Sequence, residues 1–355
     1  MKEHLTEGAI ANLLDWYRRE KRDLPWRRTT DPYRIWLSEI MLQQTRVEAV
    51  KPYYERFLKC CPNVASLASL PEEKLYKLWE GLGYYSRARN LQKAAKTVME
   101  EYGGRLPERY EQLRRLSGIG DYTAGAIASI AFGERVPAID GNVLRVLARV
   151  CASYEDIADP KTKGRWREEL ASLVPEQAGD FNQSLIELGA TVCVPNGAPK
   201  CERCPLRDAC ESAKRELTDQ IPVRSAKRAR RIEQRTVMIV QDGQRIVLRK
   251  RPNKGLLAGL YEPPNVEGHL LEDEALQYLR GLGFDPIHIE RIGDSKHIFT
   301  HVEWHMIAYA VRITPEFEGH NPIEGLQLLE MENVRKSYAV PSAFSAYADY
   351  LRGAK

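Results

Sequence analysis

A glycine-rich turn followed by an aspartate is the first pattern in the sequence that could do chemistry. Gly118 and Gly120 lie in LSGIGDYTAGA, and Asp140 follows twenty residues after the second glycine. Glycines let a backbone approach a phosphate closely, and an acidic residue at about this distance also occurs in dinucleotide-binding sites. The turn could bind the pyrophosphate of a cofactor or a phosphate of a nucleic-acid backbone, or it could only join two helices.

The neighbouring residues exclude the dinucleotide site. Such a site needs a strand before the turn and a parallel strand after the next helix, whereas the preceding PERYEQLRRL is typical of a helix. Thr123 also occupies the position of the third glycine in the dinucleotide pattern. A turn between two helices still offers the N–H groups of a helix N-terminus, which suits a nucleic-acid phosphate.

Four of the seven cysteines lie close together, at Cys193, Cys201, Cys204 and Cys210, with gaps of seven, two and five residues. This crowding indicates a metal site rather than a disulfide framework. Zinc sites more often use two CxxC pairs separated by a longer loop. A single compact set of four thiolates fits a 4Fe–4S cluster, and we expect it to have a structural or DNA-docking role.

The elements that must position these residues fall into two halves. Residues 1–221 have apolar residues at helical spacing, as in DPYRIWLSEIMLQQTRVEAV, and predict an all-α domain. Residues 222–234 are rich in arginine and lysine and predict an exposed basic linker. Residues 235–355 predict an α+β domain, with a hairpin around Asp242-Gly243, one or two strands in FTHVEWHMIAYAVRI, and helices over 272–283 and 341–353.

The overall composition limits the class of protein without identifying it. With 43% hydrophobic and 29% charged residues the chain is typical of a folded, water-soluble protein, and a net charge of +4 is only a weak sign of an anionic partner. The sequence contains no run of eighteen apolar residues and begins without a secretory signal, so we expect no membrane contact. We expect a cytoplasmic monomer.

Several segments together resemble a known family. LSGIGDYTAGA, with VPAID ending at Asp140, resembles the helix-hairpin-helix, Gly/Pro-rich loop and aspartate signature of the endonuclease III superfamily of DNA glycosylases. LPWR, WLSEIMLQQTRVEAV, WEGLGYYSRARNL, DGNVLRVLAR and FNQSLIELGA are similar to the MutY adenine DNA glycosylases within it. The resemblance implies that Gly118 and Gly120 bind a DNA backbone phosphate and that the four cysteines hold a 4Fe–4S cluster. The superfamily has a first cysteine gap of six residues, one fewer than this chain.

The resemblance also implies a catalytic set. Removing adenine requires an acid for the leaving base and an anion beside the cationic sugar, so two carboxylates must take opposed roles. Glu39, in the apolar WLSEIML, would be the acid, and Asp140 would stabilise the sugar, with Asn142 and Tyr122 orienting Asp140. From the residues alone, Glu39 could instead face solvent and Asp140 could only cap the helix GNVLRVL.

The residue at position 122 bears on a second activity. Superfamily members that also cleave the DNA strand carry a lysine there, because Schiff-base chemistry needs an amine. Tyr122 cannot supply one, so the resemblance implies a monofunctional glycosylase.

Further residues are expected to contact an extruded base, which must leave the duplex to react. By resemblance, Trp26, Arg27 and Gln183 contact the adenine, and Gln44 and Tyr84 wedge into the base stack. Core packing is the alternative for Trp26 and Tyr84, because aromatic residues pack in cores far more often than they stack on bases.

The C-terminal part resembles the Nudix-like domain that MutY proteins use to recognise 8-oxoguanine. It lacks the acid-rich box that holds magnesium in Nudix hydrolases, so we expect no phosphohydrolase activity. Phe299, Thr300 and His301 match the loop that contacts the oxidised guanine, and ordinary strand residues are the alternative. The sequence therefore predicts a base-excision-repair enzyme, associated with the bacterial nucleoid, that removes adenine mispaired with 8-oxoguanine or guanine in double-stranded DNA. A different mismatch glycosylase and a non-catalytic DNA-binding protein are the alternatives.

Overall fold

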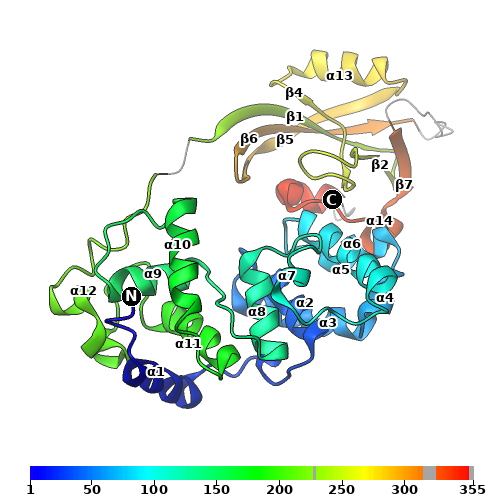
Figure 1. Cartoon of the computed structure of the whole chain (residues 1–355). Coiled ribbons are helices and arrows are strands. Elements are labelled where there is room, and N and C mark those ends of the chain that lie inside the picture. Colours follow the sequence, from blue (N-terminus) through cyan, green and yellow to red (C-terminus); the bar gives the residue numbers. More distant parts are fainter. Residues whose placement is uncertain (227–228, 315–324, 352–355) are drawn as a thin grey trace. The chain divides into compact units, whose positions relative to one another are not determined.

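The computed structural model describes residues 1–226, 229–314 and 325–351, and the chain forms two compact units (Figure 1). The first unit comprises Met1–Ser69 and Asn90–Lys227, and the second comprises Leu70–Arg89 and Arg228–Lys355. The second unit thus includes a segment that lies within the predicted helical domain. Composition could not reveal this assignment, because Leu70–Arg89 has the same helical pattern as the residues on either side of it.

The first unit is helical, as predicted. Its helices are α1 (Glu7–Glu20), α2 (Pro32–Leu42), α3 (Val47–Cys60), α4 (Val64–Ala68), most of α6 (Ser86–Glu101), α7 (Tyr110–Leu113), α8 (Asp121–Phe132), α9 (Gly141–Val150), α10 (Pro160–Ala171), α11 (Ala178–Thr191) and α12 (Glu211–Lys214). Short 3₁₀ helices cover Pro25–Arg27, Cys201–Arg203 and Arg207–Ala209. Residues 1–221 are all described, and no strand occurs among them.

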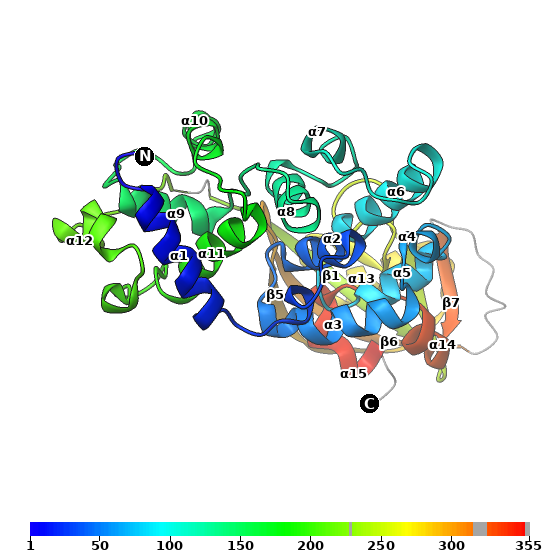
Figure 2. The same cartoon turned by 60° about the horizontal axis from the view of Figure 1, so that its bottom comes forward.

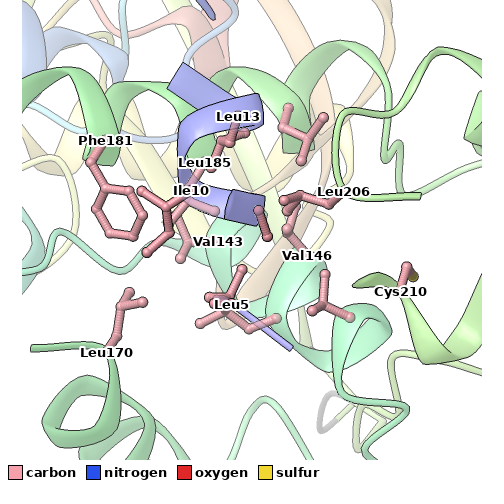
Figure 3. Packing of buried hydrophobic residues seen from close by; sticks show 14 of the residues in the cluster. Leu5, Ile10, Leu13, Val143, Val146, Leu170, Phe181, Leu185, Leu206 and Cys210 are labelled. Atoms are coloured by element: carbon pink, nitrogen blue, oxygen red, sulfur yellow. The ribbon is translucent and has the colours of Figure 1, made fainter. Parts of the chain in front are cut away.

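The N-terminal helix packs against helices that are distant from it in the sequence. Helix α1 lies beside α9 and α11 in both views (Figures 1 and 2). Figure 3 shows this apolar cluster, which includes Leu5, Ile10, Leu13, Val143, Val146, Phe181, Leu185, Leu206 and Cys210. The cluster therefore joins the first helix to the helix that begins at Asp140 and to the segment that carries the four cysteines.

Two helix N-termini place the residues of chemical interest. Asp140 is the N-cap of α9 and accepts hydrogen bonds from the backbone N–H groups of Asn142 and Val143. Gly120 is the N-cap of α8, a helix that is apolar on most of its surface and is buried from Thr123 to Ser129. Helix α2, which carries Glu39, packs against α8.

The loop before Asp140 is held on both sides. On one side it crosses α8 at Gly125, where an added Cβ would lie 2.3 Å from the carbonyl oxygen of Pro137. On the other side the buried side chain of Asn182 on α11 accepts a hydrogen bond from the N–H of Ala138 and donates to the carbonyl of Val136. This close packing leaves no room for a side chain at position 125 and fixes the path of the chain to Asp140.

The second unit contains one mixed sheet. Its strands are β1 (Arg231–Gln241), β2 (Arg245–Lys250), β3 (Tyr261–Glu262), β4 (Asn265–Glu267), β5 (Pro286–Ile298), β6 (Val302–Ile313) and β7 (Leu326–Glu330). The strand order is β3-β2-β1-β6-β5, with β4 paired to β1 and β7 paired to β2, and only β1 and β6 are parallel among these pairs. The helices are α5 (Glu72–Trp79), α13 (Glu272–Gly281), α14 (Met331–Ser337) and α15 (Ala348–Leu351).

The sheet is covered on both faces. Alternate residues of β1 enter two different apolar clusters, Val237 and Ile239 in one and Met238 and Val240 in the other, as the two-residue period of a strand requires. The predicted hairpin is present, with β1 and β2 antiparallel across Asp242-Gly243.

Two other predictions for this half need changing in detail. The helix predicted over 341–353 begins as a 3₁₀ helix, Ser342–Tyr347, before α15, and its last residues lie outside the described part of the chain. Strand β1 begins at Arg231, within the predicted linker, because its first residue already pairs with Val302 of β6. No helix in the described residues is long and apolar enough to cross a membrane.

Replacing Gly125 by alanine is expected to destabilise the first unit by about 1–3 kcal/mol, because the new methyl group would overlap the Pro137 carbonyl. Gly164, inside α10, is a matched control, since its added Cβ would meet no atom within 4 Å beyond the backbone of its own helix. Gly164→Ala is expected to stabilise the chain by about 0.5–1 kcal/mol through its higher helix propensity. Urea unfolding of both variants tests this, and a Gly125→Ala variant as stable as Gly164→Ala would contradict the packing argument.

Candidate active site

Glu39 is a buried carboxyl group with one directed partner. It lies on α2 with 8% of its surface exposed, and the phenol of Tyr122, at the start of α8, donates a hydrogen bond of 2.7 Å to Glu39 Oε2. Burial raises the pKa of Glu39 to about 7, and the negative charge of Asp140 raises it further. The hydrogen bond from Tyr122 and the positive charge of Arg27 lower the pKa but do not outweigh burial. The solvent-facing alternative is therefore excluded, and a carboxyl with this pKa suits a general acid at neutral pH.

Asp140 has a different environment. Its Oδ1 accepts 2.8 Å hydrogen bonds from the backbone N–H groups of Asn142 and Val143, and its Oδ2 accepts one of 2.7 Å from Asn142 Nδ2. Burial raises the pKa of Asp140, while the hydrogen bonds from Val143 and Asn142 act in the opposite direction. Donors at a helix N-terminus stabilise the ionised carboxylate, so the capping role and a chemical role are compatible here.

Tyr122 faces both carboxylates. Burial and the charges of Glu39 and Asp140 raise the pKa of its phenol well above the ordinary value, so that it stays a hydrogen-bond donor. The family resemblance implies that Tyr122 orients Asp140, whereas the hydrogen bond of its phenol in the structure goes to Glu39. Asn142 does contact Asp140, as expected.

A buried arginine that sequence reasoning missed supports Asn142. Arg145 Nη2 donates to Asn142 Oδ1 at 2.9 Å and to the carbonyl of Gly189 at 2.7 Å, and Arg145 Nε donates to the carbonyl of Cys193 at 2.8 Å. A chain of hydrogen bonds therefore runs from Asp140 through Asn142 and Arg145 to the first of the four cysteines. The available signal was the spacing of Asn142, Arg145 and Arg149 in GNVLRVLARV, which places these three residues on one face of the helix.

The glycine-rich turn has the geometry of a backbone-binding turn. Gly118 has φ +77°, and a Cβ there would lie 2.7 Å from Asn90 Cβ, so that only glycine fits. Gly120 follows in an extended conformation and caps α8, whose first N–H groups point along the helix axis. Gly120 lies two residues before Tyr122. The candidate phosphate site is therefore close in the chain to the tyrosine that faces Glu39 and Asp140.

The four cysteines line one cavity. Cys193, Cys201, Cys204 and Cys210 surround it, together with apolar residues such as Val146 and Leu188. In the described residues, no three His, Cys, Asp or Glu side chains are close enough to hold a single metal ion. A 4Fe–4S cluster takes four thiolate ligands, and four cysteines around one cavity are the donor set that it requires. Gly197, with φ +75°, allows the turn that accommodates the longer first gap.

Comparisons with known proteins agree with this geometry. Residues 37–176 match the model of the HhH-GPD superfamily of base excision DNA repair proteins, and residues 235–350 match that of the NUDIX domain. The adenine DNA glycosylase from Rattus norvegicus is 34% identical to the chain, and the alignment covers 96% of the chain and 78% of that protein. The adenine DNA glycosylase from Homo sapiens is 36% identical, and the alignment covers 88% of the chain and 68% of that protein. The chain belongs to the adenine DNA glycosylase family.

The solved structures support the helical fold. A thermostable thymine-DNA glycosylase superposes on 58% of the chain and 95% of its own length, with a TM-score of 0.54 and 30% identity. An endonuclease III trapped on DNA superposes with a TM-score of 0.50 and 23% identity, over 59% of the chain and 95% of its own length. The predicted class, a helix-hairpin-helix glycosylase domain followed by a Nudix-like α+β domain, is confirmed.

The residues that family resemblance assigns to the adenine differ in burial and in their contacts. Trp26 is 6% exposed and packs edge-to-face on Tyr54 with ring centroids 5.5 Å apart, so it is a core residue in this structure. Gln183 is partly buried on α11. Arg27 donates a 2.7 Å hydrogen bond to the buried Glu187, a partner that sequence reasoning missed.

The two predicted wedge residues share an unusual backbone. Gln44 has φ +58° and Tyr84 has φ +48°, and both side chains are exposed, Tyr84 by 48%. A non-glycine residue in this region costs about 1–3 kcal/mol, and such residues gather at functional sites. The core-packing alternative for Tyr84 is excluded by its exposure.

The second unit contains a pocket of about 390 Å³ that brings Tyr84 together with Phe299, Thr300 and His301. These three residues lie in the turn between β5 and β6, closed by a hydrogen bond from Phe299 N to the carbonyl of Val302, rather than within a strand. The ring of Phe299 packs on that of Trp304, with ring centroids 4.9 Å apart, while Thr300 and His301 are exposed. The turn thus presents a hydroxyl and an imidazole to the pocket that also contains Tyr84.

Glu39→Gln is expected to make the protein more stable at pH 8 and to have less effect at pH 5. The folded protein holds the Glu39 proton up to a pKa of about 7, above the ordinary 4.5, so this stabilisation is present below pH 4.5 and is lost as pH rises through about 7. Glutamine stays neutral, and its advantage at pH 8 is about 3 kcal/mol at most. Urea unfolding at both pH values tests this.

The exposed Glu168 of α10 provides the control. Glu168→Gln is expected to change stability equally at pH 5 and pH 8. If Glu39→Gln behaves like this control, Glu39 is ionised in the folded protein throughout the range.

Proposed function

We propose that the protein is a monofunctional adenine DNA glycosylase that acts on adenine opposite 8-oxoguanine or guanine in double-stranded DNA. The observation that carries this proposal is the pair of carboxylates around Tyr122: Glu39, whose pKa burial raises to about 7, and Asp140, held by a helix N-terminus. Two carboxyl groups with different hydrogen-bond partners fit the two roles, acid and anion, that N-glycosidic bond cleavage requires.

Glu39 supplies the proton. Tyr122 occupies Glu39 Oε2, which leaves Oε1 as the oxygen for the extruded base. The proton passes from Glu39 to N7 of adenine, and the electrons of the N-glycosidic bond leave with the base. The phenol of Tyr122 then stabilises the new carboxylate, which accepts a proton from the attacking water.

Asp140 supplies the negative charge next to the cationic sugar. The N–H groups of Asn142 and Val143 fix one of its oxygens, and Asn142 Nδ2 fixes the other, so that the carboxylate does not need to reorganise as charge develops. Tyr122 occupies the position of the lyase lysine in the family's strand-cleaving relatives. The product is therefore an intact strand with an abasic site.

The remaining features support a DNA partner. The turn at Gly118 and Gly120 contacts a backbone phosphate, and the pocket of Tyr84, Thr300 and His301 recognises the 8-oxoguanine. Cys193, Cys201, Cys204 and Cys210 hold a 4Fe–4S cluster, which when bound crosslinks the segment after α11. The protein acts as a monomer on chromosomal DNA in the cytoplasm.

Another mismatch glycosylase is the second candidate, because a thymine-DNA glycosylase shares the helical fold at 30% identity. That similarity covers 58% of the chain, whereas the adenine DNA glycosylase of Rattus norvegicus aligns with 96% of it. The adenine reaction is therefore preferred.

The test is a single-turnover assay on duplexes with adenine opposite 8-oxoguanine, adenine opposite guanine, and thymine opposite guanine. We expect strand breaks only after alkali, fastest for the 8-oxoguanine duplex, and a loss of at least about 100-fold in rate for Glu39→Gln. Breaks without alkali would contradict the monofunctional assignment. Preferential release of thymine would favour the second candidate.

The 8-oxoguanine contact is tested separately at Thr300, with the hydroxyl retained or removed. Thr300→Ala is expected to reduce the preference for 8-oxoguanine over guanine, and Thr300→Ser to preserve it. Equal preference in wild type and Thr300→Ala would exclude the hydroxyl from lesion recognition.

The cluster is tested by iron and sulfide analysis of anaerobically purified protein. We expect about four of each per chain, and their loss in Cys204→Ser but not in Cys60→Ser, since Cys60 lies outside the cavity. A wild-type protein without iron that excises adenine at the full rate would contradict the assignment.

A further inference from the structure

Glu187 is a fully buried carboxylate that the proposed chemistry does not use. It lies on α11, and its side chain has no exposed surface. Its Oε1 accepts hydrogen bonds from the backbone N–H and from Nε of Arg22, at 3.0 and 2.8 Å. Its Oε2 accepts from Arg22 Nη2 at 2.8 Å and from Arg27 Nη2 at 2.7 Å. Burial alone would raise the pKa of Glu187, but the hydrogen bonds from Arg22 and Arg27 outweigh it and lower the pKa to about 2.

The two arginines are not equivalent. The Arg22 side chain is 38% exposed, whereas that of Arg27 is 9% exposed. Arg27 Nη1 also donates to the carbonyl of Arg22, and its guanidinium lies 5.5 Å from the ring centre of Tyr17. Arg27 is therefore a cation enclosed by protein, and Glu187 is its carboxylate partner.

This enclosed cation lies beside the helix that carries the acid, because the 3₁₀ helix Pro25–Arg27 packs against α2. The charge of Arg27 lowers the pKa of Glu39, in opposition to burial and to the charge of Asp140. The other groups that face Glu39 are Tyr122 from α8 and Asp140 from the start of α9. A general acid must keep its proton until the base arrives, so an uncompensated cation at Arg27 would work against the reaction.

We propose that Glu187 is a positioning residue for the acid site: it holds the guanidinium of Arg27 in place and neutralises it, so that Arg27 can contact the base without drawing the proton from Glu39. This inference rests on the proposed function, because it assumes that Glu39 is the acid. The other charged and titratable groups around Glu187 are Arg22, which faces solvent, and Tyr17 of α1.

The experiment measures the rate of adenine release in single turnover between pH 5 and pH 9. In the wild type the rate falls on the alkaline side as Glu39 loses its proton. Glu187→Gln keeps the shape of the side chain but leaves the Arg27 charge uncompensated. We expect the midpoint of the alkaline limb to move to lower pH by about half a unit or more, which reduces the ratio of rates at pH 8 and pH 6 about threefold.

Two matched variants separate charge from structure. Arg22→Gln removes the arginine that also donates to Glu187 but leaves the Glu187–Arg27 pair, so its midpoint should not fall below that of the wild type. Arg27→Gln/Glu187→Gln removes the enclosed cation together with its counter-ion, and its midpoint should return to the wild-type value or above it. If Glu187→Gln lowers the rate equally at every pH, Glu187 has only a structural role and the proposal is overturned.

Glu187→Asp is a second test variant, for use if Glu187→Gln does not fold. Aspartate retains the charge on a shorter side chain, so the rate should fall while the midpoint stays in place. A midpoint displaced to lower pH in Glu187→Asp would overturn the proposal. Failure of the proposed function is distinguishable, because Glu39→Gln would then retain the wild-type rate.

Discussion

The burial of one carboxyl group is the constraint on which the first unit depends. An ionised carboxylate without partners is costly to bury, so Glu39 is tolerated only where a donor faces it and its proton is retained. The Tyr122 phenol provides the donor, and it reaches Glu39 because α8 packs against α2. The apolar surface of α8, the glycine at its crossing with the loop before Asp140, and the turn that starts it all serve this arrangement.

The second carboxylate is placed by different means. Asp140 is anchored by the N-terminus of α9, by Asn142 and, through Asn142, by Arg145. Its position therefore depends on the packing of α9 and α11 with α1, and on the loop of Cys193, whose carbonyl accepts from Arg145. One site thus combines two buried carboxyl groups: Glu39 accepts a hydrogen bond from a phenol, and Asp140 accepts three from Asn142 and Val143.

The sequence predicts backbone features better than the partners of buried polar side chains. Asp140 before GNVLRVL predicts a helix cap, and it is one; WLSEIML predicts burial of Glu39, which is found; Asp242-Gly243 predicts a hairpin, which is present. Glu187 and Arg145 were missed because a charged residue in a helix usually faces solvent. Arg22 and Glu187 are 165 positions apart, and no local pattern in the sequence indicates a pair that forms only when distant segments pack together.

The assignment of Leu70–Arg89 to the second unit has a consequence for how the chain can be divided. Inside that unit, Lys77 donates to the carbonyl of Tyr338, Glu80 accepts from the N–H of Val340, and Arg89 donates to the carbonyl of Ala258. A cut in the basic segment after Lys227 therefore does not release two intact pieces. The N-terminal fragment would keep Lys77, Glu80 and Arg89 but lose the backbone groups that bond to them, and the C-terminal fragment would lose one wall of its pocket. Proteolytic fragments of this protein are thus incomplete on both sides of the cut, although the sequence gives the impression of two modules in tandem.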